Sequence, residues 1–352
     1  MGAGTSRRNI KAITSNIAAV FEQLGAPNTV SSVLTELRSP ERNEIVASLI
    51  LDGILEIEIE KVFVSQCEAY HAIVENDNNI GGSGRLANLS VDALKHGQRL
   101  GISDPAMLAA RLYFYHRMPV TSGWKRLWPD ANAVLRYLGA APGGALRHDL
   151  SACFEITSQS GNVPWLSWSL RRHRTGDSGV RNWFKLYVSP APQHTREAFA
   201  EVVALLPGST ALSLKIGSNA HGLLRPDKLV VYFDRHDGLL AFAESLLRRI
   251  AGQTAHGVPF SAPIDDAGIL SWGSDPPPGE GGIGWYADDS WRIWICNRLA
   301  LALIAAIDCP NIEVTPWRYA LAKLTLSGVE TRTWTLQVKG CLESGNPIGK
   351  HL

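Results

Sequence analysis

The chain has 352 residues, a formal net charge of +1, 45% hydrophobic residues and 19% charged residues. This length allows one large domain or two of ordinary size, and the apolar fraction excludes a globally disordered chain. The near-neutral charge argues against a general nucleic-acid binder. No apolar run reaches the roughly 18 residues of a membrane span, and no apolar signal segment follows the basic N-terminus. We therefore expect a cytoplasmic protein that binds neither nucleic acid nor membrane.

The first half of the chain reads mainly as helices. Apolar spacing predicts helices over 13–24, 30–37 and 40–51. Alternation of apolar residues with glutamates over 55–60 predicts a half-buried strand, and 62–64 is its return partner. Three helices and a hairpin have the outline of a winged helix, but the acidic hairpin face would repel DNA phosphates. Peptide docking on the hairpin edge and a plain scaffold both stay open.

A glycine-rich run over 139–144 follows further predicted helices at 90–100, 104–116 and 131–138. We take it as the boundary between regions of different composition. The predicted organisation is a helical region with a hairpin over 1–140, an α+β anion-binding or catalytic domain over 145–340, and a tail over 341–352.

The second half alternates strands with helices. Strands are predicted at 164–172, 183–189, 212–217, 229–234, 269–272 and 334–338, helices at 196–206, 239–251 and 290–307, and either element at 318–326. The connections suit a mixed, largely antiparallel sheet. The helices at 196–206 and 239–251 would cover one face, which makes the fold class α+β.

Period-two alternation in these strands predicts one polar sheet face. This face carries Arg171, Lys185, Tyr187, Ser213, Lys215 and Tyr232, with Lys228 on the same side and the loop residues His221, Arg225 and Asp227 close by. Between Trp165 and Arg235 the chain has ten Lys and Arg residues against five acids. Mid-strand lysines are costly to bury unless they are paired.

Three interpretations of this face stay open. It is solvated, or each lysine pairs with an acid such as Asp227. Alternatively it is an anion pocket for a phosphate or diphosphate, in which arginine forks and tyrosine hydroxyls donate hydrogen bonds and a lysine with a lowered pKa acts as a base. His221 is a candidate proton donor, and Asp227 a candidate support for Arg225.

The common cofactor and metal motifs are missing from the sequence. The five cysteines are scattered singly, and the acid pairs 265–266 and 288–289 look like loop or helix-cap residues. No nucleotide-binding loop, serine-hydrolase elbow or zinc-protease motif occurs. We therefore expect no cofactor and no metal.

The order of short motifs in the second half resembles a known domain. The motifs are Lys185-Leu186-Tyr187, Leu214-Lys215, Arg225-Pro226-Asp227 with Val230-Val231-Tyr232, Val258 to Ser261, Asp275-Pro276, Ser290-Trp291 with Arg298 to Ala300, and Gly328-Val329 before Trp334-Thr335. Over roughly 164–336 this order resembles the Hop A class of bacterial type III effectors. That domain recurs as the lyase component of class V lanthipeptide biosynthesis. The pattern departs near Asn297 and Arg298, where the arginine register is shifted.

The resemblance implies a lyase that eliminates phosphate from phosphoserine or phosphothreonine of a ribosomal precursor peptide, giving dehydroalanine or dehydrobutyrine. A separate peptide kinase would supply the substrate. By position, Lys215 would be the base, and Tyr187, Tyr232 or His221 would protonate or orient the leaving group. The phosphate would be bound by Arg171, Lys185, Arg225 and Lys228, with Asp227 in support.

Two other functions fit a cationic face. An aromatic prenyltransferase would bind an isoprenyl diphosphate inside a polar barrel of Lys-x-Tyr strands, and tryptophans would shield a carbocation. A non-catalytic, effector-like module would use the same pocket to recognise a phosphorylated peptide.

Overall fold

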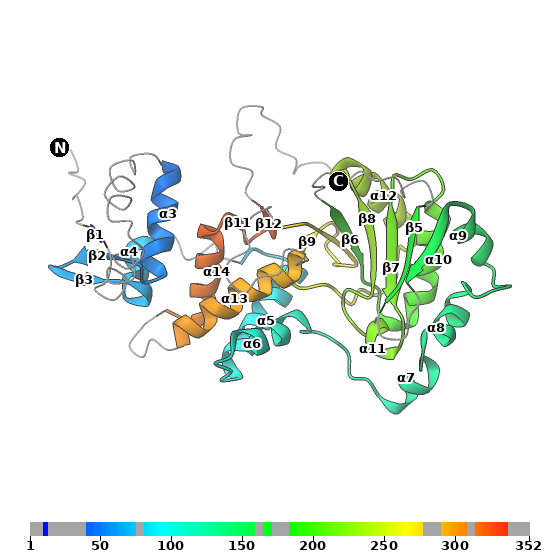
Figure 1. The fold of residues 1–352 in the computed structure, drawn as a ribbon, viewed down its shortest axis with the longest axis horizontal. Helices are drawn as coiled ribbons and strands as arrows, with labels where there is room; N and C mark the ends of the chain where they lie inside the picture. Colours follow the sequence, from blue (N-terminus) through cyan, green and yellow to red (C-terminus); the bar gives the residue numbers. More distant parts are fainter. Residues whose placement is uncertain are drawn as a thin grey trace, which may run out of the picture.

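The computed structural model describes residues 10–12, 40–74, 81–158, 165–170, 183–276, 290–307 and 314–336. The fold is α+β, as predicted: a large antiparallel sheet lies at one end of an elongated molecule, and helices and a small sheet occupy the rest (Figure 1). No helix in these residues is long and apolar enough to cross a membrane.

The small sheet is built from the predicted hairpin and one further strand. Its order is β1 (Ile10–Ala12), β2 (Leu55–Ile59) and β3 (Val62–Val64), with all pairs antiparallel. Helix α3 (Pro40–Leu51) and the short α4 (Tyr70–Ile73) accompany it. The hairpin and the helix at 40–51 confirm the prediction, whereas strand β1 had no sequence signal. The helices predicted at 13–24 and 30–37 lie outside the described residues.

Four helices form a second core in the middle of the molecule. They are α5 (Arg85–Arg99), α6 (Pro105–Tyr113), α13 (Trp291–Ile307) and α14 (Pro316–Leu326), joined by the short pair β11 (Val329–Glu330) and β12 (Thr335–Leu336). Asp104 caps α6 by accepting a hydrogen bond from the backbone N–H of Met107. The segment at 318–326, predicted as either element, is a helix.

The large sheet has the strand order β4-β5-β7-β8-β6-β10-β9, and every neighbouring pair is antiparallel. Its strands are β4 (Phe154–Ser158), β5 (Trp165–Leu170), β6 (Phe184–Val188), β7 (Ser213–Gly217), β8 (Leu229–Phe233), β9 (Ala262–Pro263) and β10 (Leu270–Ser274). The sheet is open, with β4 and β9 at its edges. It therefore lacks the closed barrel that the prenyltransferase interpretation assumed.

One face of this sheet is apolar and buried, as the strand alternation predicts. Leu166, Leu186, Leu214 and Val231 are fully buried there. Helices α10 (Thr195–Leu205) and α12 (His236–Arg249) pack against them and confirm the predicted cover. Four shorter helices join the same core: α7 (Ser122–Leu127), α8 (Ala131–Leu138), α9 (Arg147–Cys153) and α11 (Ala220–Leu223). The predicted domain boundary near Gly139 stays a prediction.

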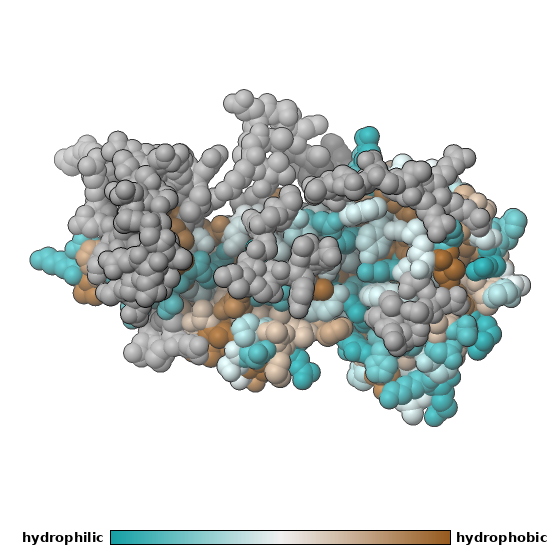
Figure 2. All heavy atoms as spheres, in the orientation of Figure 1, coloured by the Kyte–Doolittle hydropathy of each residue, from teal (hydrophilic) through white to brown (hydrophobic). Residues whose placement is uncertain are grey.

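The opposite face carries the polar side chains and looks toward the middle helices. The hydrophilic residues at the lower right of Figure 2 lie where Figure 1 places α7 and α11, two helices that belong to the core on the apolar side of the sheet. Helix α13 approaches the polar face closely, because Gly273 of β10 leaves room for the indole of Trp291. A Cβ at Gly273 would lie 2.8 Å from that ring, so this glycine lets the start of α13 reach the sheet.

Gly217 makes a comparable close approach at the end of β7. A Cβ there would lie 2.3 Å from the carbonyl carbon of Gly222, which belongs to the backbone of α11. We predict that Gly217→Ala lowers the free energy of unfolding by about 3 kcal/mol, because backbone cannot move aside as a flexible side chain can. Urea denaturation measures this change.

Gly123→Ala in α7 is the matched control, since its added Cβ has only an ordinary contact. It should alter the free energy of unfolding by no more than about 1 kcal/mol. Equal stability of the two variants would contradict the close-approach argument.

Candidate active site

The polar sheet face forms a pocket of about 360 Å³ on strands β6, β7 and β8. The described residues that line it are Trp183, Lys185, Ser213, Lys215, Tyr232, Asp275 and Ser290. The strand register explains this set, because Tyr232 lies directly opposite both Lys185 and Ser213. The predicted meeting of polar side chains from separate strands is therefore present in the fold.

Lys215 is largely buried in this pocket and makes no hydrogen bond or ion pair to any residue that the structure describes. Its Nζ lies 4.6 Å from the ring centroid of Trp165 and 5.4 Å from that of Tyr232. Burial lowers the pKa of Lys215 from 10.5 to about 8; Asp227 opposes this change, and Lys185 and Arg225 add to it. A lysine whose pKa is lowered in this way gives up its proton more readily than an ordinary lysine, as a general base requires.

Lys185, by contrast, has a carboxylate partner. Its Nζ donates to Asp275 Oδ1, and the other oxygen of Asp275 accepts the backbone N–H of Trp183 at 3.1 Å. Asp275 is thus fixed at the pocket wall. The two lysines of the pocket therefore differ in their partners: Lys185 is paired with a carboxylate, and Lys215 has no such partner among the described residues.

Beside the pocket, a buried carboxylate holds two arginines. Asp227 accepts two hydrogen bonds from Arg225, each 2.8 Å long, and its Oδ2 lies 2.9 Å from Nη1 of Arg292. Tyr113 Oη donates to the same Oδ2 at 3.2 Å and accepts from Arg225 Nη2 at 2.7 Å. Burial alone would raise the pKa of Asp227, but the two arginines hold it well below its usual range.

The two arginines differ in the partners of their guanidinium nitrogens. Arg292 is 1% exposed, and it also donates to the carbonyl oxygens of Pro259 and Tyr113 at 3.0 and 2.8 Å. Arg225 makes no hydrogen bond through Nη1 to any described residue, and its Cζ lies 4.8 Å from the Trp165 ring that Lys215 also contacts. Arg225 therefore has a guanidinium edge without a described hydrogen-bond partner close to Lys215, whereas Arg292 is enclosed and its Nη1 meets Asp227 as an ion pair only.

The charges of this cluster favour a dianion. Four cations (Lys185, Lys215, Arg225 and Arg292) face two carboxylates, those of Asp227 and Asp275, which leaves two positive charges in excess among the described residues. A phosphomonoester carries about −1.5 to −2 charges at pH 7. The site is therefore electrostatically complementary to one phosphate group.

Three tyrosines surround the same cluster with neutral hydroxyls. Burial is the largest cause in each case: it raises the pKa of Tyr113 to about 12 and raises those of Tyr187 and Tyr232 well above their ordinary value. The Tyr187 hydroxyl has no hydrogen-bond partner among the described residues. These groups keep their protons over the whole working range and can donate hydrogen bonds to an oxyanion.

The structure does not bring every predicted site residue to the pocket. His221 is exposed on α11, where its Nδ1 lies 2.6 Å from Nη2 of Arg117. Lys228 is fully buried, and its Nζ is turned to Pro190 O and His256 instead. Arg171 lies outside the described residues.

Sequence reasoning missed Arg292, Tyr113 and Trp165 as parts of the site. Arg292 had a usable signal, because it is a lone cation at the start of the apolar helix α13. The sequence pattern directed attention to Arg298, whose guanidinium stacks over Trp294 at 3.8 Å. Tyr113 had no signal, since only the tertiary fold brings α6 to the loop that carries Asp227.

Similar structures come from bacterial effector proteins and phosphothreonine lyases. An effector protein from Pseudomonas syringae pv. syringae strain 61 is 11% identical over 72% of this chain and 99% of its own, with a TM-score of 0.43. One from Pseudomonas syringae pv. tomato strain DC3000 is 12% identical over 70% and 96%, with a TM-score of 0.42. The phosphothreonine lyase SpvC, an effector from Salmonella, is 16% identical over 52% and 89%, with a TM-score of 0.30.

No family model matches the chain, and no curated protein matches it at a significant level. Similarity as distant as that of the three structures does not transfer an activity to this chain.

The unpaired state of Lys215 has a measurable cost in stability. Below pH 8 the buried amine is charged in the folded and unfolded chain, so folding pays the full cost of desolvation. Between about pH 8 and 10.5 the unfolded chain binds more protons, and stability therefore rises with pH. We predict that Lys215→Met raises the free energy of unfolding at pH 7 by about 2 kcal/mol.

Thermal unfolding of wild type and Lys215→Met from pH 7 to 10 measures this difference, which should narrow as pH rises. Lys125→Met is the control, because Lys125 is exposed on α7. If the difference in the free energy of unfolding between wild type and Lys215→Met stayed constant from pH 7 to 10, Lys215 would be charged over this whole range.

Proposed function

We propose that this protein is a lyase that eliminates phosphate from phosphoserine or phosphothreonine in a peptide. The observation that carries the proposal is Lys215, a buried amine with no acceptor among the described residues, beside an edge of the Arg225 guanidinium that also has no described partner. The motif resemblance over 164–336 supports the same reaction. It also suggests a precursor peptide of lanthipeptide type, phosphorylated by a separate kinase.

The first half of the reaction removes the α-proton of the phosphorylated residue. With a pKa of about 8, roughly one tenth of Lys215 is unprotonated at pH 7, against about one in three thousand for an ordinary lysine. Neutral Lys215 Nζ takes the proton as the Cα–H bond breaks. The negative charge that develops on the adjacent carbonyl oxygen is stabilised by the surrounding cations and hydroxyl groups.

The second half expels the phosphate. The electron pair of the Cα–H bond forms the Cα=Cβ double bond, and the Cβ–O bond breaks with its electron pair on the phosphate oxygen. Arg225 and Lys185 are placed to stabilise this leaving group, and Tyr187 or Tyr232 donates a hydrogen bond to it. The products are a dehydroalanine or dehydrobutyrine residue and inorganic phosphate, with no water consumed.

The site favours catalysis over simple phosphopeptide binding. A binding module gains most from donors that stay charged at every working pH, whereas the lowered pKa of Lys215 reduces its charged fraction as the pH approaches 8. Nothing in a binding role requires Lys215 to lack a partner. The open sheet, in turn, gives no support to the prenyltransferase interpretation.

Mass spectrometry of phosphoserine and phosphothreonine peptides after incubation with the protein tests the proposal. Elimination removes the elements of phosphoric acid and leaves a residue that adds thiols, whereas hydrolysis restores the free hydroxyl. Intact phosphopeptide would indicate a binder, and restored serine or threonine would indicate a phosphatase. Either result would overturn the lyase assignment.

Lys215→Ala removes the base, and we predict that kcat falls by about 10³-fold while phosphopeptide binding persists. In the wild type, kcat/KM should rise with pH toward a plateau above about pH 8, because the neutral amine is the active form. Rates of phosphate release measure both effects. Unchanged turnover in Lys215→Ala would remove this residue from the mechanism.

Arg225→Lys replaces a planar fork by a point charge, and we predict that KM for the phosphopeptide rises roughly 10- to 100-fold. Arg235→Lys is the matched control, because Arg235 is an exposed arginine paired with Asp237 over the same i, i+2 spacing. Its kinetics should stay at the wild-type level. A near-normal KM in Arg225→Lys would count against the phosphate clamp.

A further inference from the structure

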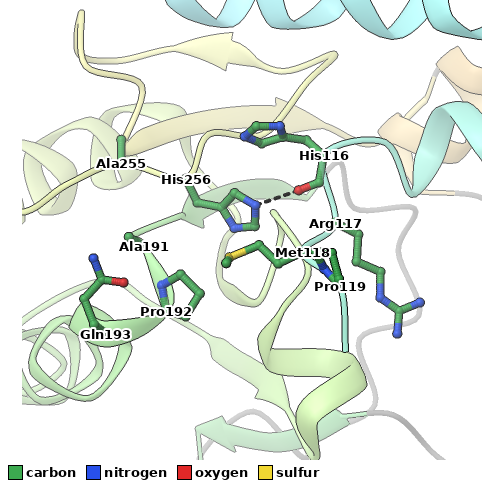
Figure 3. Close-up of a pocket in the computed structure, with 9 residues that line it drawn as sticks. All are labelled: His116, Arg117, Met118, Pro119, Ala191, Pro192, Gln193, Ala255 and His256. Atoms are coloured by element: carbon green, nitrogen blue, oxygen red, sulfur yellow. Dashed lines mark hydrogen bonds between the residues drawn. The ribbon is translucent and has the colours of Figure 1, made fainter. Parts of the chain in front are cut away.

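A second cavity of about 510 Å³ opens beside the loop that follows α6. His116, Arg117 and Met118 line one side of it, and Ala191, Pro192 and His256 line the other (Figure 3). The His256 ring lies between these two walls, and a dashed line in Figure 3 marks its hydrogen bond to the backbone oxygen of His116. The imidazole thus connects the loop after α6 to the body of the sheet domain.

Behind His256, the buried Lys228 completes a chain of hydrogen bonds. Lys228 Nζ lies 2.9 Å from His256 Nδ1 and 2.7 Å from Pro190 O, and His256 Nε2 lies 2.6 Å from His116 O. A carbonyl oxygen only accepts, so Nε2 carries the proton and Nδ1 of the neutral ring accepts from Lys228. The lysine donates two hydrogens, which both its charged and its neutral form possess.

The loop held by this chain has a backbone that needs support. His116 has a φ of 66°, in the left-handed region that side chains other than glycine rarely adopt. Its carbonyl oxygen is fixed by His256, and two residues later the N–H of Met118 donates to Leu224 O at 3.0 Å. Leu224 directly precedes Arg225 in the chain, so the loop is tied to the strand connection that carries the phosphate clamp.

At its other end the same loop starts at Tyr113, the last residue of α6. Tyr113 contacts all three members of the charged network: Arg225 and Asp227 through its hydroxyl and Arg292 through its carbonyl oxygen. A shift of the loop after α6 would therefore move a hydrogen-bond partner of each of these residues.

We propose that Lys228 and His256 form a buried latch that fixes the loop after α6 and so positions Tyr113 against Arg225 for phosphate binding. The proposal rests on the lyase function for its kinetic consequences but not for its structural ones. It assigns Lys228 and His256 as positioning residues, because neither lines the pocket that contains Lys215.

The hydrogen bonds of Lys228 and His256 support a positioning role and not a direct part in the reaction. Both ring nitrogens of His256 are occupied, and the Lys228 amine already serves two acceptors. Burial is the main cause that lowers the pKa of Lys228 to about 7, so the fold bears a cost to keep an amine at this position. A leucine would fill the space without that cost but would not hold the imidazole.

The structural test uses NMR of the full chain with its tyrosines selectively labelled. The ring signal that disappears in Tyr113→Phe is assigned to Tyr113. Lys228→Met should shift this signal. Tyr319→Phe, which removes a buried hydrogen bond of 2.7 Å to Leu51 O far from the site, should not. An unmoved Tyr113 signal in Lys228→Met would overturn the latch, whether or not the protein eliminates phosphate.

The kinetic test uses a phosphothreonine peptide. Lys228→Met should lower kcat/KM roughly tenfold, mainly through KM, and the double variant with Tyr113→Phe should fall no further than the worse single variant. If the loss of kcat/KM in the double variant equalled the product of the two single losses, the residues would act independently. A wild type that releases no phosphate would refute the lyase while leaving the NMR result to decide the latch.

A second pair of variants covers the case in which Lys228→Met does not fold. His256→Gln places an amide nitrogen near the position of Nε2, where it can donate to His116 O, whereas the shorter His256→Asn cannot reach it. We expect His256→Gln to keep most of the wild-type kcat/KM and the Tyr113 signal, and His256→Asn to lose both. Equal behaviour of the two would overturn the proposed bond.

Discussion

The candidate site depends on one buried carboxylate, Asp227, held between two guanidinium groups. A carboxylate without water needs opposite charge and hydrogen bonds, and Arg225, Arg292 and Tyr113 supply both. The three come from separate parts of the chain: the loop before β8, the start of α13 and the end of α6. Satisfying this single group therefore fixes the arrangement of three elements around the polar sheet face.

The same carboxylate explains why Lys215 is left free. Asp227 is already engaged by Arg225, Arg292 and Tyr113, and the other acid of the cluster, Asp275, is engaged by Lys185. Among the described residues, Lys215 is therefore left without an ion-pair partner, and its Nζ lies over the rings of Trp165 and Tyr232. This distribution of four cations over two acids agrees with the roles proposed above, in which Lys215 is the base and Arg225 and Lys185 bind phosphate.

Much of the large sheet could be predicted from its alternating residues, since a strand with one buried face fixes the side of every residue it contains. That rule places Lys185, Lys215 and Tyr232 on the same face of the sheet. It gave no information on residues outside the strands. Lys228 obeys the alternation of β8 but lies beyond the pocket, where His256 and Pro190 O take its hydrogen bonds.

The sequence pattern could not predict which remote segments of the chain contact one another. Arg292 and Tyr113 reach Asp227 only because α6 and α13 pack together beside the sheet and Gly273 lets α13 come close. The apolar residues of the two helices specify a core, and the motif residues that the resemblance places on α13 do not include Arg292. The proposed phosphate clamp therefore depends on how two cores meet: the sheet supplies Lys215, which has no partner among the described residues, and the helical layer holds Arg225 beside it.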